Sequence, residues 1–345
     1  PFSTGPRTAA PAPSPNKKHV FLSVQSVIAE KLPATGHKIA IVGAGPAGLT
    51  AAFYLIRLGH AVTVFDKYPE AGGIMRWGIP AYRLPRKVLA HEVNFLKKLG
   101  VKFTLKTEIG KGASLKALST KFDKIFLATG AEKEMGLGIP GEKLKGVVQG
   151  MAVLAKVAAG KKLALGKKVI VIGGGNVAID AARTALRLGA EVTVAYRRDK
   201  DAMPANLYEI ESAIKEKIKF EYFVAPKSIK AKQGKVIGLE VDTMKPGAWD
   251  MSGRRKPVAS GETKVIPCDS VILAIGEKVD AKVFNKLKVD LNNDGTVLID
   301  IKNFRTSNPQ VHAGGDMVLG PATAAEAMAH GKWAAEEIDS ELVPL

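Results

Sequence analysis

Short apolar runs alternate along this chain with glycine-rich turns and with segments whose apolar residues recur at helical spacing. Lys38–Val42 has the pattern of a short buried strand, and Gly43–Gly48 predicts a tight turn. Leu49–Leu58 has helical spacing, Gly59 predicts its end, and Ala61–Phe65 has the pattern of a second strand. This order predicts a strand–helix–strand unit of the kind that binds dinucleotides.

The same order of elements returns 130 residues later (173 minus 43). It comprises a strand at Lys168–Ile172, a turn at Gly173–Ala178, a helix that runs to Leu188 and stops at Gly189, and a strand at Glu191–Tyr196. An internal repeat of this unit predicts two nucleotide-binding sites in one chain.

Two further strand patterns end at Thr129–Gly130 and at Ala274–Gly276, and each is interpreted as a strand that returns to its own sheet. The tail predicts a strand, a turn at Gly314–Gly315 followed by Asp316, and a helix that starts near Thr323. We therefore expect an α/β fold with two Rossmann-like dinucleotide-binding domains, the second inserted into the first. The expected bounds are 38–150 and 270–345 for the split domain, 151–269 for the inserted one, and 1–37 for a flexible leader or linker.

The first turn has the spacing G-x-G-x-x-G, at Gly43, Gly45 and Gly48. Glycines at these positions permit a tight turn, a close approach of the backbone to a pyrophosphate, and close packing of helix on strand. The helix N-terminus then offers free amides to the phosphates. Asp66 stands 23 residues after Gly43 (66 minus 43), at the end of the second strand, where an acid can bind both ribose hydroxyls.

The second turn differs at the corresponding position, which holds Tyr196 instead of an acid and is followed by Arg197 and Arg198. A carboxylate there would repel a 2′-phosphate, whereas a guanidinium can bind one bidentately. The arginine pair therefore predicts NADPH as the preferred cofactor, with NADH possible. The alternative is that one or both arginines are ordinary surface charges.

Composition limits the remaining possibilities. The 345 residues are 46% apolar and 24% charged, which fits a globular protein of two domains, and no apolar run is long enough to cross a bilayer. The only cysteine, Cys268, excludes an internal disulfide, a redox dithiol and a four-cysteine cluster, so no metal site is expected. It is interpreted as a buried residue, and the lack of cysteine pairs agrees with a cytoplasmic protein. The net charge of +18 comes without a nucleic-acid-binding motif, which favours a solvated basic surface or one that attracts an acidic redox partner over a nucleic acid.

Four segments taken together resemble a known family. They are "IAIVGAGPAGLTAAFYLIRLGHAVTVFDKYPEAGGIMRWGIPAYRLPRKVL", "ATGAE…IPGE", "VIVIGGGNVAIDAARTALRLGAEVTVAYRRDKDAMPA" and "TSNPQVHAGGDMVLGPATAAEAMAHGK". In this order they resemble the glutamate synthase small subunit, the flavin subunits of NADH-dependent ferredoxin–NADP oxidoreductases, and the matching part of dihydropyrimidine dehydrogenase. The resemblance extends over nearly everything from Lys38 onward, and its motifs are specific for the superfamily rather than for one member.

The resemblance implies FAD in the split domain, with the pyrophosphate at the first turn, the ADP ribose at Asp66, and the ribitol and flavin toward the C-terminal helix. The implied FAD residues are Gly43, Ala44, Gly45, Ala47, Gly48, Asp66, Gly73, Arg76, Thr129, Gly130, Gly315, Asp316, Thr323, Ala324 and Ala325. The implied NADP residues are Gly173, Gly174, Gly175, Asn176, Val177, Arg197, Arg198 and Gly276. For Arg76 and Asp316 the alternatives are a surface salt bridge and a turn cap.

This chain departs from the family pattern in two places. Relatives usually carry an N-terminal iron–sulfur domain with clustered cysteines, whereas no cysteine precedes the first strand here, so any cluster is expected on another subunit. The segment "AIGEKVD" also lacks the proline that commonly follows its glycine in relatives, which leaves the nicotinamide pocket open to variation.

These features predict an FAD-dependent NAD(P)H oxidoreductase that exchanges electrons with an acidic iron–sulfur subunit or ferredoxin, in either direction, within a larger complex. Hydride transfer through a flavin needs no general acid or base from the protein, and no catalytic side chain is assigned. The alternative functions are a subunit that holds FAD without turnover, and a nucleic-acid-binding protein suggested by the charge alone.

Overall fold

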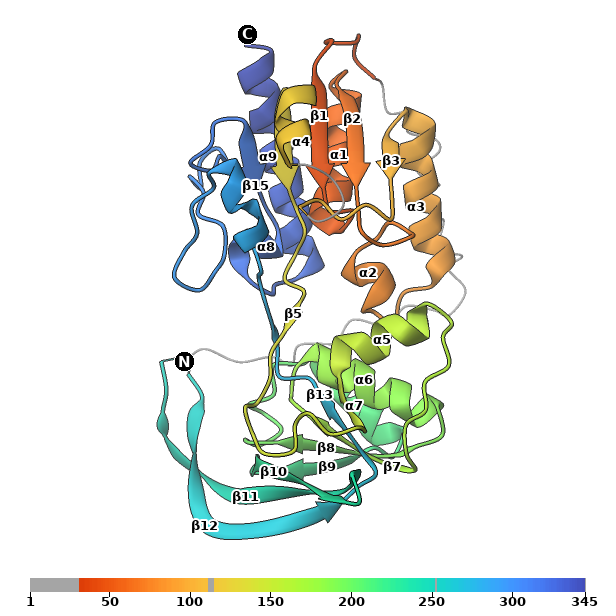
Figure 1. Ribbon diagram of the computed structural model, residues 1–345, viewed down its shortest axis with the longest axis vertical. Coiled ribbons are helices and arrows are strands. Elements are labelled where there is room, and N and C mark those ends of the chain that lie inside the picture. The colour runs from red at the N-terminus through yellow and green to blue at the C-terminus, as the bar shows by residue number, and fades with distance from the viewer. Residues whose placement is uncertain (1–30, 111–114, 252, 345) are drawn as a thin grey trace, which may run out of the picture.

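The computed structural model describes residues 31–110, 115–251 and 253–344. Most of the expected leader, residues 1–37, lies outside these ranges. The described chain forms two halves, each built on its own sheet, which are drawn one above the other in Figure 1. None of the helices in the described ranges is both long and apolar enough to cross a membrane.

The upper half has a five-stranded parallel sheet in the order β15-β4-β1-β2-β3. Its strands are β1 (Lys38–Val42), β2 (Ala61–Phe65), β3 (Lys102–Thr104), β4 (Lys124–Leu127) and β15 (Val311–Ala313). Its helices are α1 (Pro46–Arg57), α3 (Arg86–Leu99), α4 (Leu115–Lys121), α9 (Ala324–Leu342) and the 3-10 helix η2 (Lys282–Leu287). Alternate residues of β1 belong to two different core clusters. Ile39 and Ile41 share one with α1, α3 and α9, whereas Ala40 and Val42 share the other with α4 and η2. The sheet is therefore buried on both sides, as its continuous apolar strands require.

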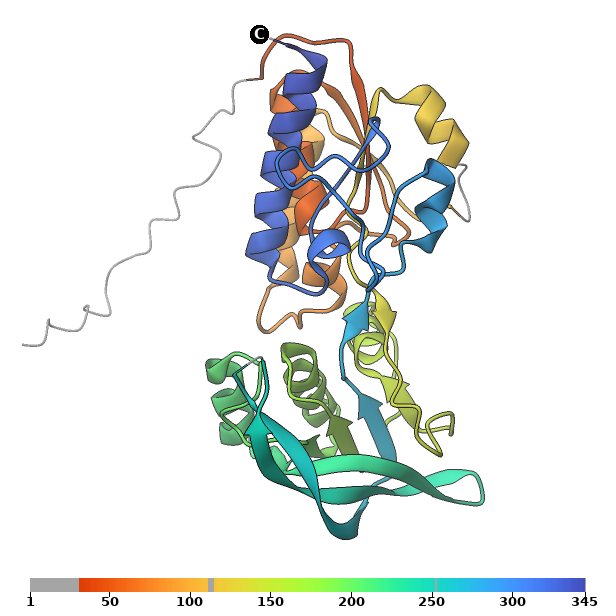
Figure 2. The same cartoon turned by 90° about the vertical axis from the view of Figure 1, so that its left-hand side faces the viewer.

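The lower half has a second parallel sheet, in the order β6-β13-β7-β8-β9. Its strands are β6 (Val147–Gln149), β7 (Lys168–Ile172), β8 (Glu191–Tyr196), β9 (Lys219–Tyr222) and β13 (Ser270–Leu273). Helices α5 (Gly150–Ala158), α6 (Asn176–Arg187) and α7 (Leu207–Lys215) cover one face. The other face packs on an antiparallel sheet of β10 (Val224–Lys232), β11 (Lys235–Trp249) and β12 (Arg255–Pro267), whose long hairpin curves beneath the molecule in Figure 2.

The internal repeat is confirmed with the predicted offset: β7 begins 130 residues after β1 (168 minus 38), and α6 begins 130 residues after α1 (176 minus 46). Both helices begin inside the segments that the sequence assigned to turns, at Pro46 and Asn176. Proline is favoured at the first helical position because that amide has no helical partner in any case. The last residues of each glycine motif are thus the first turn of a helix.

The predicted domain bounds need correction at two strands. Strands β6 and β13 both belong to the lower sheet, because β13 pairs in parallel with β6 on one side and with β7 on the other. Bounds at 150/151 and 269/270 would place both strands in the upper half. The chain crosses between the halves at β5 (Lys133–Glu134) and β14 (Glu277–Lys278), which form a two-stranded antiparallel ladder visible at the centre of Figure 1. We propose that the two domains divide within this ladder.

Candidate functional site

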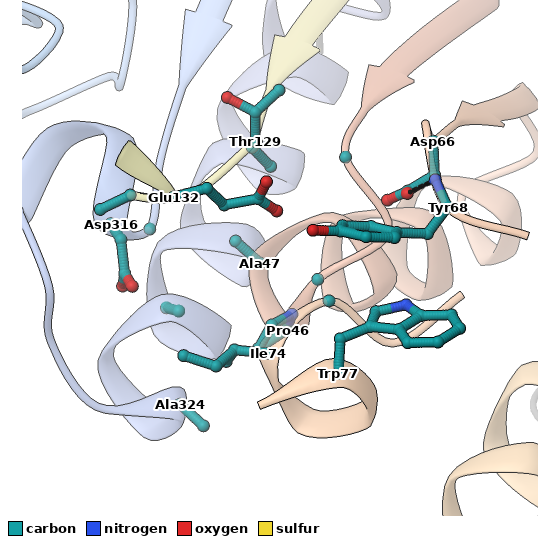
Figure 3. A pocket seen from close by; sticks show the side chains of 18 of the residues that line it. Pro46, Ala47, Asp66, Tyr68, Ile74, Trp77, Thr129, Glu132, Asp316 and Ala324 are labelled. Carbon is teal, nitrogen blue, oxygen red and sulfur yellow. Dashed lines mark hydrogen bonds between the residues drawn. The ribbon is translucent and has the colours of Figure 1, made fainter. Parts of the chain in front are cut away.

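A cavity of about 310 Å³ lies at the carboxyl ends of the upper strands, where parallel α/β sheets bind their ligands. Its wall is formed by the segments after β1, β2, β4 and β15, by the short helix α2 (Ile74–Trp77), and by the first turns of α1, α5 and α9. Figure 3 shows that these side chains converge from distant parts of the sequence on one space. The volume falls in the range of small-molecule and cofactor sites.

The first glycine turn forms the floor of this cavity. Gly43 has φ +109°, and a Cβ there would lie 2.2 Å from the carbonyl oxygen of Ala128, so only glycine allows β1 and β4 to approach so closely. Gly45 faces open space, because a Cβ at this position would have its nearest neighbour 4.0 Å away. Helix α1 has no side-chain cap at Gly45 and no acid in its first turn. Its free amides and dipole therefore suit a phosphate.

Asp66 fixes the turn from the neighbouring strand. Its Oδ2 accepts a hydrogen bond from the amide of Ala44 at 2.7 Å, and its Oδ1 accepts one from the amide of Tyr68 at 2.8 Å. Burial raises the pKa of Asp66, and the two amides oppose that effect. Asp66 lines the cavity and each of its oxygens can accept a further hydrogen bond, so this carboxylate can bind ribose hydroxyls while it holds the turn in shape.

The opposite end of the cavity is made by the chain after β15. Gly315 adopts φ +67° and precedes the one-turn helix α8 (Asp316–Leu319). Burial raises the pKa of Asp316 to about 6. Helix α9 starts next to it with a capping box, in which Thr323 accepts a hydrogen bond from the amide of Glu326 and donates its own amide to the Glu326 carboxylate. The start of α9 near Thr323 is thereby confirmed.

The structure brings most of the expected FAD residues into this wall. Those that line the cavity are Gly43, Gly45, Ala47, Asp66, Gly73, Thr129, Gly130, Gly315, Asp316, Thr323 and Ala324. The remaining four, Ala44, Gly48, Arg76 and Ala325, are not in the wall. Arg76 forms an ion pair with Glu70, and its guanidinium lies over the ring of Trp77 at 5.6 Å. Arg76 therefore packs against a residue of the wall without lining the cavity itself.

The wall also contains polar and aromatic residues that sequence reasoning missed, among them Lys67, Tyr68, Trp77 and Glu132. The rings of Tyr68 and Trp77 stack at 5.2 Å and form one side of the cavity in Figure 3. Lys67 forms an ion pair with Glu132, which extends into the space from the segment after β4. All four lie inside segments that carry the family resemblance, but the sequence assigned none of them a binding role. Their side chains join the wall only when these segments fold against one another.

The second glycine turn repeats the first in the lower half. Gly173 has φ +144°, and a Cβ there would lie 2.1 Å from the carbonyl oxygen of Ala274, as at Gly43 and Ala128. A Cβ at Gly175 would meet no atom within 4 Å, and α6 has neither a side-chain cap nor an acid in its first turn. The backbone here is also open to a phosphate.

Tyr196 takes the place that Asp66 has in the first unit. A Cβ at Gly174 would lie 2.4 Å from the Tyr196 ring, and the Tyr196 hydroxyl donates to the carbonyl of Ala202 at 2.8 Å. The ring therefore packs on the turn where the first unit has a carboxylate. No negative charge is introduced at this point, which suits a ligand that carries an extra phosphate.

The two arginines after Tyr196 have different environments. Arg197 is exposed, and within the described residues no hydrogen bond or ion pair holds its side chain. Arg198 is buried: its Nη2 lies 3.0 Å from an oxygen of Asp250 and its Nε donates to the carbonyl of Arg255 at 2.9 Å. The Arg198 guanidinium thus holds the β11–β12 hairpin, whereas that of Arg197 is the one of the expected pair that is exposed.

The other expected NADP residues surround the turn or lie beyond it. Asn176 is exposed at the start of α6 and accepts a hydrogen bond from the amide of Asn206 at 3.0 Å. Val177 is half-buried next to the start of α5. Gly276 lies in the crossing segment with φ +115°, and its carbonyl accepts a hydrogen bond from Met135. In the described ranges, no group of three or more His, Cys, Asp or Glu side chains is placed to hold a metal ion.

Comparison with known proteins agrees with this arrangement. Residues 37–331 match the family described as pyridine nucleotide-disulphide oxidoreductase. The chain is 42% identical over 313 residues to the NADP(+)-dependent formate dehydrogenase subunit beta of Moorella thermoacetica, covering 89% of this chain and 44% of that protein. It is 36% identical over 324 residues to the glutamate synthase [NADPH] small chain of Escherichia coli, covering 88% and 68%. The fold matches FprA of Mycobacterium tuberculosis, solved in complex with NADPH, with a TM-score of 0.74, 20% identity, and 90% and 86% coverage.

These matches confirm the resemblance seen in the sequence motifs and the α/β fold of two dinucleotide-binding units. They also set a limit, because the chain spans only about half of the length of the formate dehydrogenase subunit, 44%, and about two thirds of the glutamate synthase chain, 68%. The activities of those whole proteins therefore apply to this chain only as proposals.

Proposed function

We propose, since this chain belongs to the pyridine nucleotide-disulphide oxidoreductase family, that it passes electrons between NADPH and an iron–sulfur partner through a bound FAD. As a member of this family the chain is an FAD- and NADP-binding oxidoreductase. The partner, the complex and the roles of individual residues are the parts that we propose. The direction of electron flow in the cell depends on the partner, and the site suits both directions.

The cavity of the upper half fits FAD. The bare backbone at Gly45 and the uncapped N-terminus of α1 would hold the pyrophosphate, and Asp66 would bind the ADP ribose. Asp316 and the start of α9 would bind the other end of the molecule, next to the crossing segments and α5. Arg76 contributes indirectly, because it braces Trp77 in the wall.

The second turn fits NADPH. The open backbone at Gly175 and the uncapped start of α6 would hold its pyrophosphate, and the exposed Arg197 would bind the 2′-phosphate. Tyr196 occupies the position at which a carboxylate would repel that phosphate. NADH would bind at the same turn without the contribution of Arg197.

A bound flavin supplies the chemistry, because it accepts a hydride from a nicotinamide and can release the electrons one at a time. The protein positions the two cofactors and keeps them in place. Transfer to a disulfide within this chain is excluded, since Cys268 is its only cysteine. Burial raises the pKa of that thiol to about 12, which keeps it in the unreactive protonated form. We propose that the electrons pass one at a time to an iron–sulfur centre on another chain.

Two observations support a separate partner of this kind. The two curated relatives are named as a subunit beta and a small chain, which are parts of larger enzymes. The net charge of +18 favours an acidic partner through long-range attraction. The complex we propose resembles glutamate synthase or a ferredoxin–NADP oxidoreductase. We also propose a cytoplasmic location, since a single free thiol is compatible with a reducing compartment.

The observation that carries the proposal is the repeated glycine turn, with one copy in the wall of the cavity and the other beside an exposed arginine. Anaerobic stopped-flow mixing of the flavin-loaded protein with NADPH tests it. We expect the flavin absorbance to bleach with NADPH and more weakly with NADH. A Gly175→Ala variant should keep its flavin but bleach more slowly, because the new methyl group would occupy the space at the second turn. A flavin that binds but is not reduced would support the FAD-holding subunit instead.

A further inference from the structure

The covalent connection between the two halves is slight. Within the described residues the chain passes between them at the β5–β14 ladder, which pairs only two residues on each strand. An antiparallel pair of this length is weak on its own and allows the halves to turn about it. Any fixed distance between the cavity and the second glycine turn therefore needs a further contact.

Helix α2 packs on α5 at the cavity, and the loop between α2 and α3 makes a second, charged contact farther from the crossing strands. Arg83 lies in this loop, and its Nη1 is 2.6 Å from an oxygen of Asp180 while its Nε is 2.9 Å from an oxygen of Glu209. The two carboxylates lie on α6 and α7, in the other half. In both ribbon views this orange loop approaches the lower helices at a distance from the crossing strands (Figures 1 and 2).

The ion pairs are shielded from water. The side chains of Asp180 and Glu209 are 5% and 10% exposed, and that of Arg83 is 24% exposed. Charges in such a setting interact more strongly than an exposed pair, and they hold one geometry because a guanidinium binds along fixed directions. Solvent-exposed pairs elsewhere, such as Lys264 with Glu221, lack this shielding.

Tyr82 adds a second contact beside Arg83. The guanidinium groups of Arg183 and Arg187, both on α6, lie over its ring at 4.8 and 4.0 Å. Glu216 holds both arginines in place with hydrogen bonds of 2.7 to 2.8 Å from their terminal nitrogens. The aromatic ring of one half is thus packed against two immobilised cations of the other.

Each end of this contact is attached to a cofactor site. At the upper end, Arg86 donates to the carbonyls of Met75 and Ile79 and so fixes the loop to α2, a helix that lines the cavity. At the lower end, Asp180 lies on α6 about one turn after the second glycine turn. The loop therefore connects the wall of one nucleotide site to the helix that carries the other.

From this geometry we infer that Arg83 is a positioning residue, which sets the distance and angle between the nicotinamide bound at the second turn and the flavin in the cavity. Tyr82 assists it by limiting rotation about the β5–β14 ladder. The inference rests on the proposed function, because it takes both cofactors to bind where we place them. Without this contact, NADPH would still bind but would reach the flavin in many orientations, few of them productive.

The test measures hydride transfer and domain geometry separately in the flavin-loaded full chain. Arg83→Ala should lower the limiting rate of flavin reduction at saturating NADPH by about 10- to 100-fold. The dissociation constant for NADPH should change by less than about twofold, since Arg83 is not at the second turn. Arg83→Lys keeps the positive charge but not the guanidinium, which can donate in two directions at once. Its limiting rate of flavin reduction should lie between those of the wild type and Arg83→Ala. Lys264→Ala, which removes an exposed ion pair, should match the wild type.

The geometry is read from spin labels on cysteines placed at Lys98 in α3 and Lys235 in β11, both exposed. Cys268 does not interfere, because it is buried and its thiol is unreactive. The distance distribution between the labels should be narrow in the wild type and in Lys264→Ala, and broader or shifted in Arg83→Ala. Tyr82→Ala and Asp180→Asn provide the same readouts if Arg83→Ala does not fold.

Unchanged distances together with an unchanged limiting rate in Arg83→Ala would overturn the inference and leave these contacts a purely structural role. A weaker NADPH affinity with an unchanged limiting rate would also overturn it, because Arg83 would then be a binding residue. A wild-type flavin that NADPH does not reduce is a different result, which contradicts the proposed function itself.

Discussion

Replacing Arg197 by alanine should weaken the binding of NADPH and leave the binding of NADH nearly unchanged. Arg197 follows β8 two residues after Ala195, whose carbonyl accepts a hydrogen bond from the amide of Gly173 in the second turn. Its side chain is exposed beside that turn, and Tyr196 rather than an acid precedes it. The 2′-phosphate, which NADH lacks, is the group that this guanidinium would bind.

The expected magnitude follows from the exposure of the side chain. A hydrogen bond to a charged group contributes about 1.5–3 kcal/mol. Salt screens an exposed pair, so the lower part of this range applies to Arg197. Since about 1.4 kcal/mol corresponds to a factor of ten, the dissociation constant for NADPH should rise about 10- to 30-fold. For NADH the change should stay below about twofold, because no phosphate contact is lost.

Arg198→Ala is the matched control, since it removes the same side chain from the next position. Arg198 is buried against the carboxylate of Asp250 and the carbonyl of Arg255. The Asp250 side chain is only 16% exposed, and the substitution removes its ion pair with Arg198. We expect the free energy of unfolding to fall by about 2–4 kcal/mol. The affinity for NADPH should change little.

Stopped-flow titrations with NADPH and NADH give both dissociation constants for each variant, and urea unfolding gives the stabilities. The ligand 2′,5′-ADP serves as a probe that carries the 2′-phosphate without the nicotinamide. If Arg198→Ala rather than Arg197→Ala weakened NADPH selectively, the assignment drawn from the structure would be wrong. Equal effects of Arg197→Ala on NADPH and NADH would show that no phosphate is recognised at this position.

Three further predictions follow from the packing and the buried charges. Gly45→Ala should leave the free energy of unfolding within about 0.5 kcal/mol but weaken FAD binding strongly, because its Cβ has no protein neighbour closer than 4.0 Å and would occupy the phosphate space. Gly43→Ala should instead destabilise the fold, since its Cβ would lie 2.2 Å from the Ala128 carbonyl; urea unfolding and FAD titration distinguish the two, and equal behaviour would contradict the argument. Gly331→Ala should lower the thermal midpoint at a cost of about 1–3 kcal/mol, because its Cβ would lie 2.2 Å from a carbonyl oxygen of α1; an unchanged midpoint would show that α9 can move away freely. Burial raises the pKa of Asp180 from 3.8 to about 6, so the folded state keeps its proton longer than the unfolded chain and stability falls as pH rises through that interval. Between about pH 4 and pH 7, the free energy of unfolding measured in urea should therefore fall by on the order of 2–3 kcal/mol more for the wild type than for Asp180→Asn. If the difference between the two proteins did not change with pH, the raised pKa of Asp180 would be refuted.

The sequence was sufficient for the features whose signal is local. The strands Lys38–Val42 and Lys168–Ile172 and the start of α9 were predicted at the observed positions, because apolar runs, glycine turns and a capping residue act within a few residues of each other. The offset of 130 between the two units was also correct. The expected bounds at 150/151 and 269/270 put residues 147–149 and 270–273 in the split domain, whereas both segments pair within the lower sheet. A short apolar run near a domain boundary does not reveal which sheet it joins.

The residues of the cavity wall also divide into those that the sequence could identify and those that it could not. Asp66 and the glycines could be identified because a motif with fixed spacing places them at the turn. Trp77 and Glu132 could not, since they reach the cavity only when α2 and the segment after β4 fold against it. Tertiary contacts of this kind leave no periodic trace in the sequence.

By itself, the sequence determined the kind of protein: two nucleotide turns, each with its own strand–helix–strand unit, and a tyrosine followed by two arginines in place of the second acid. The tertiary structure decided how these parts are used. It separated Arg197 from Arg198, because burial against Asp250 commits one guanidinium and leaves the other exposed. It also brought Arg83 against Asp180, 97 positions away (180 minus 83), and so joined the two halves. Neither outcome has a local signal, because a side chain's partners depend on which distant segments fold next to it.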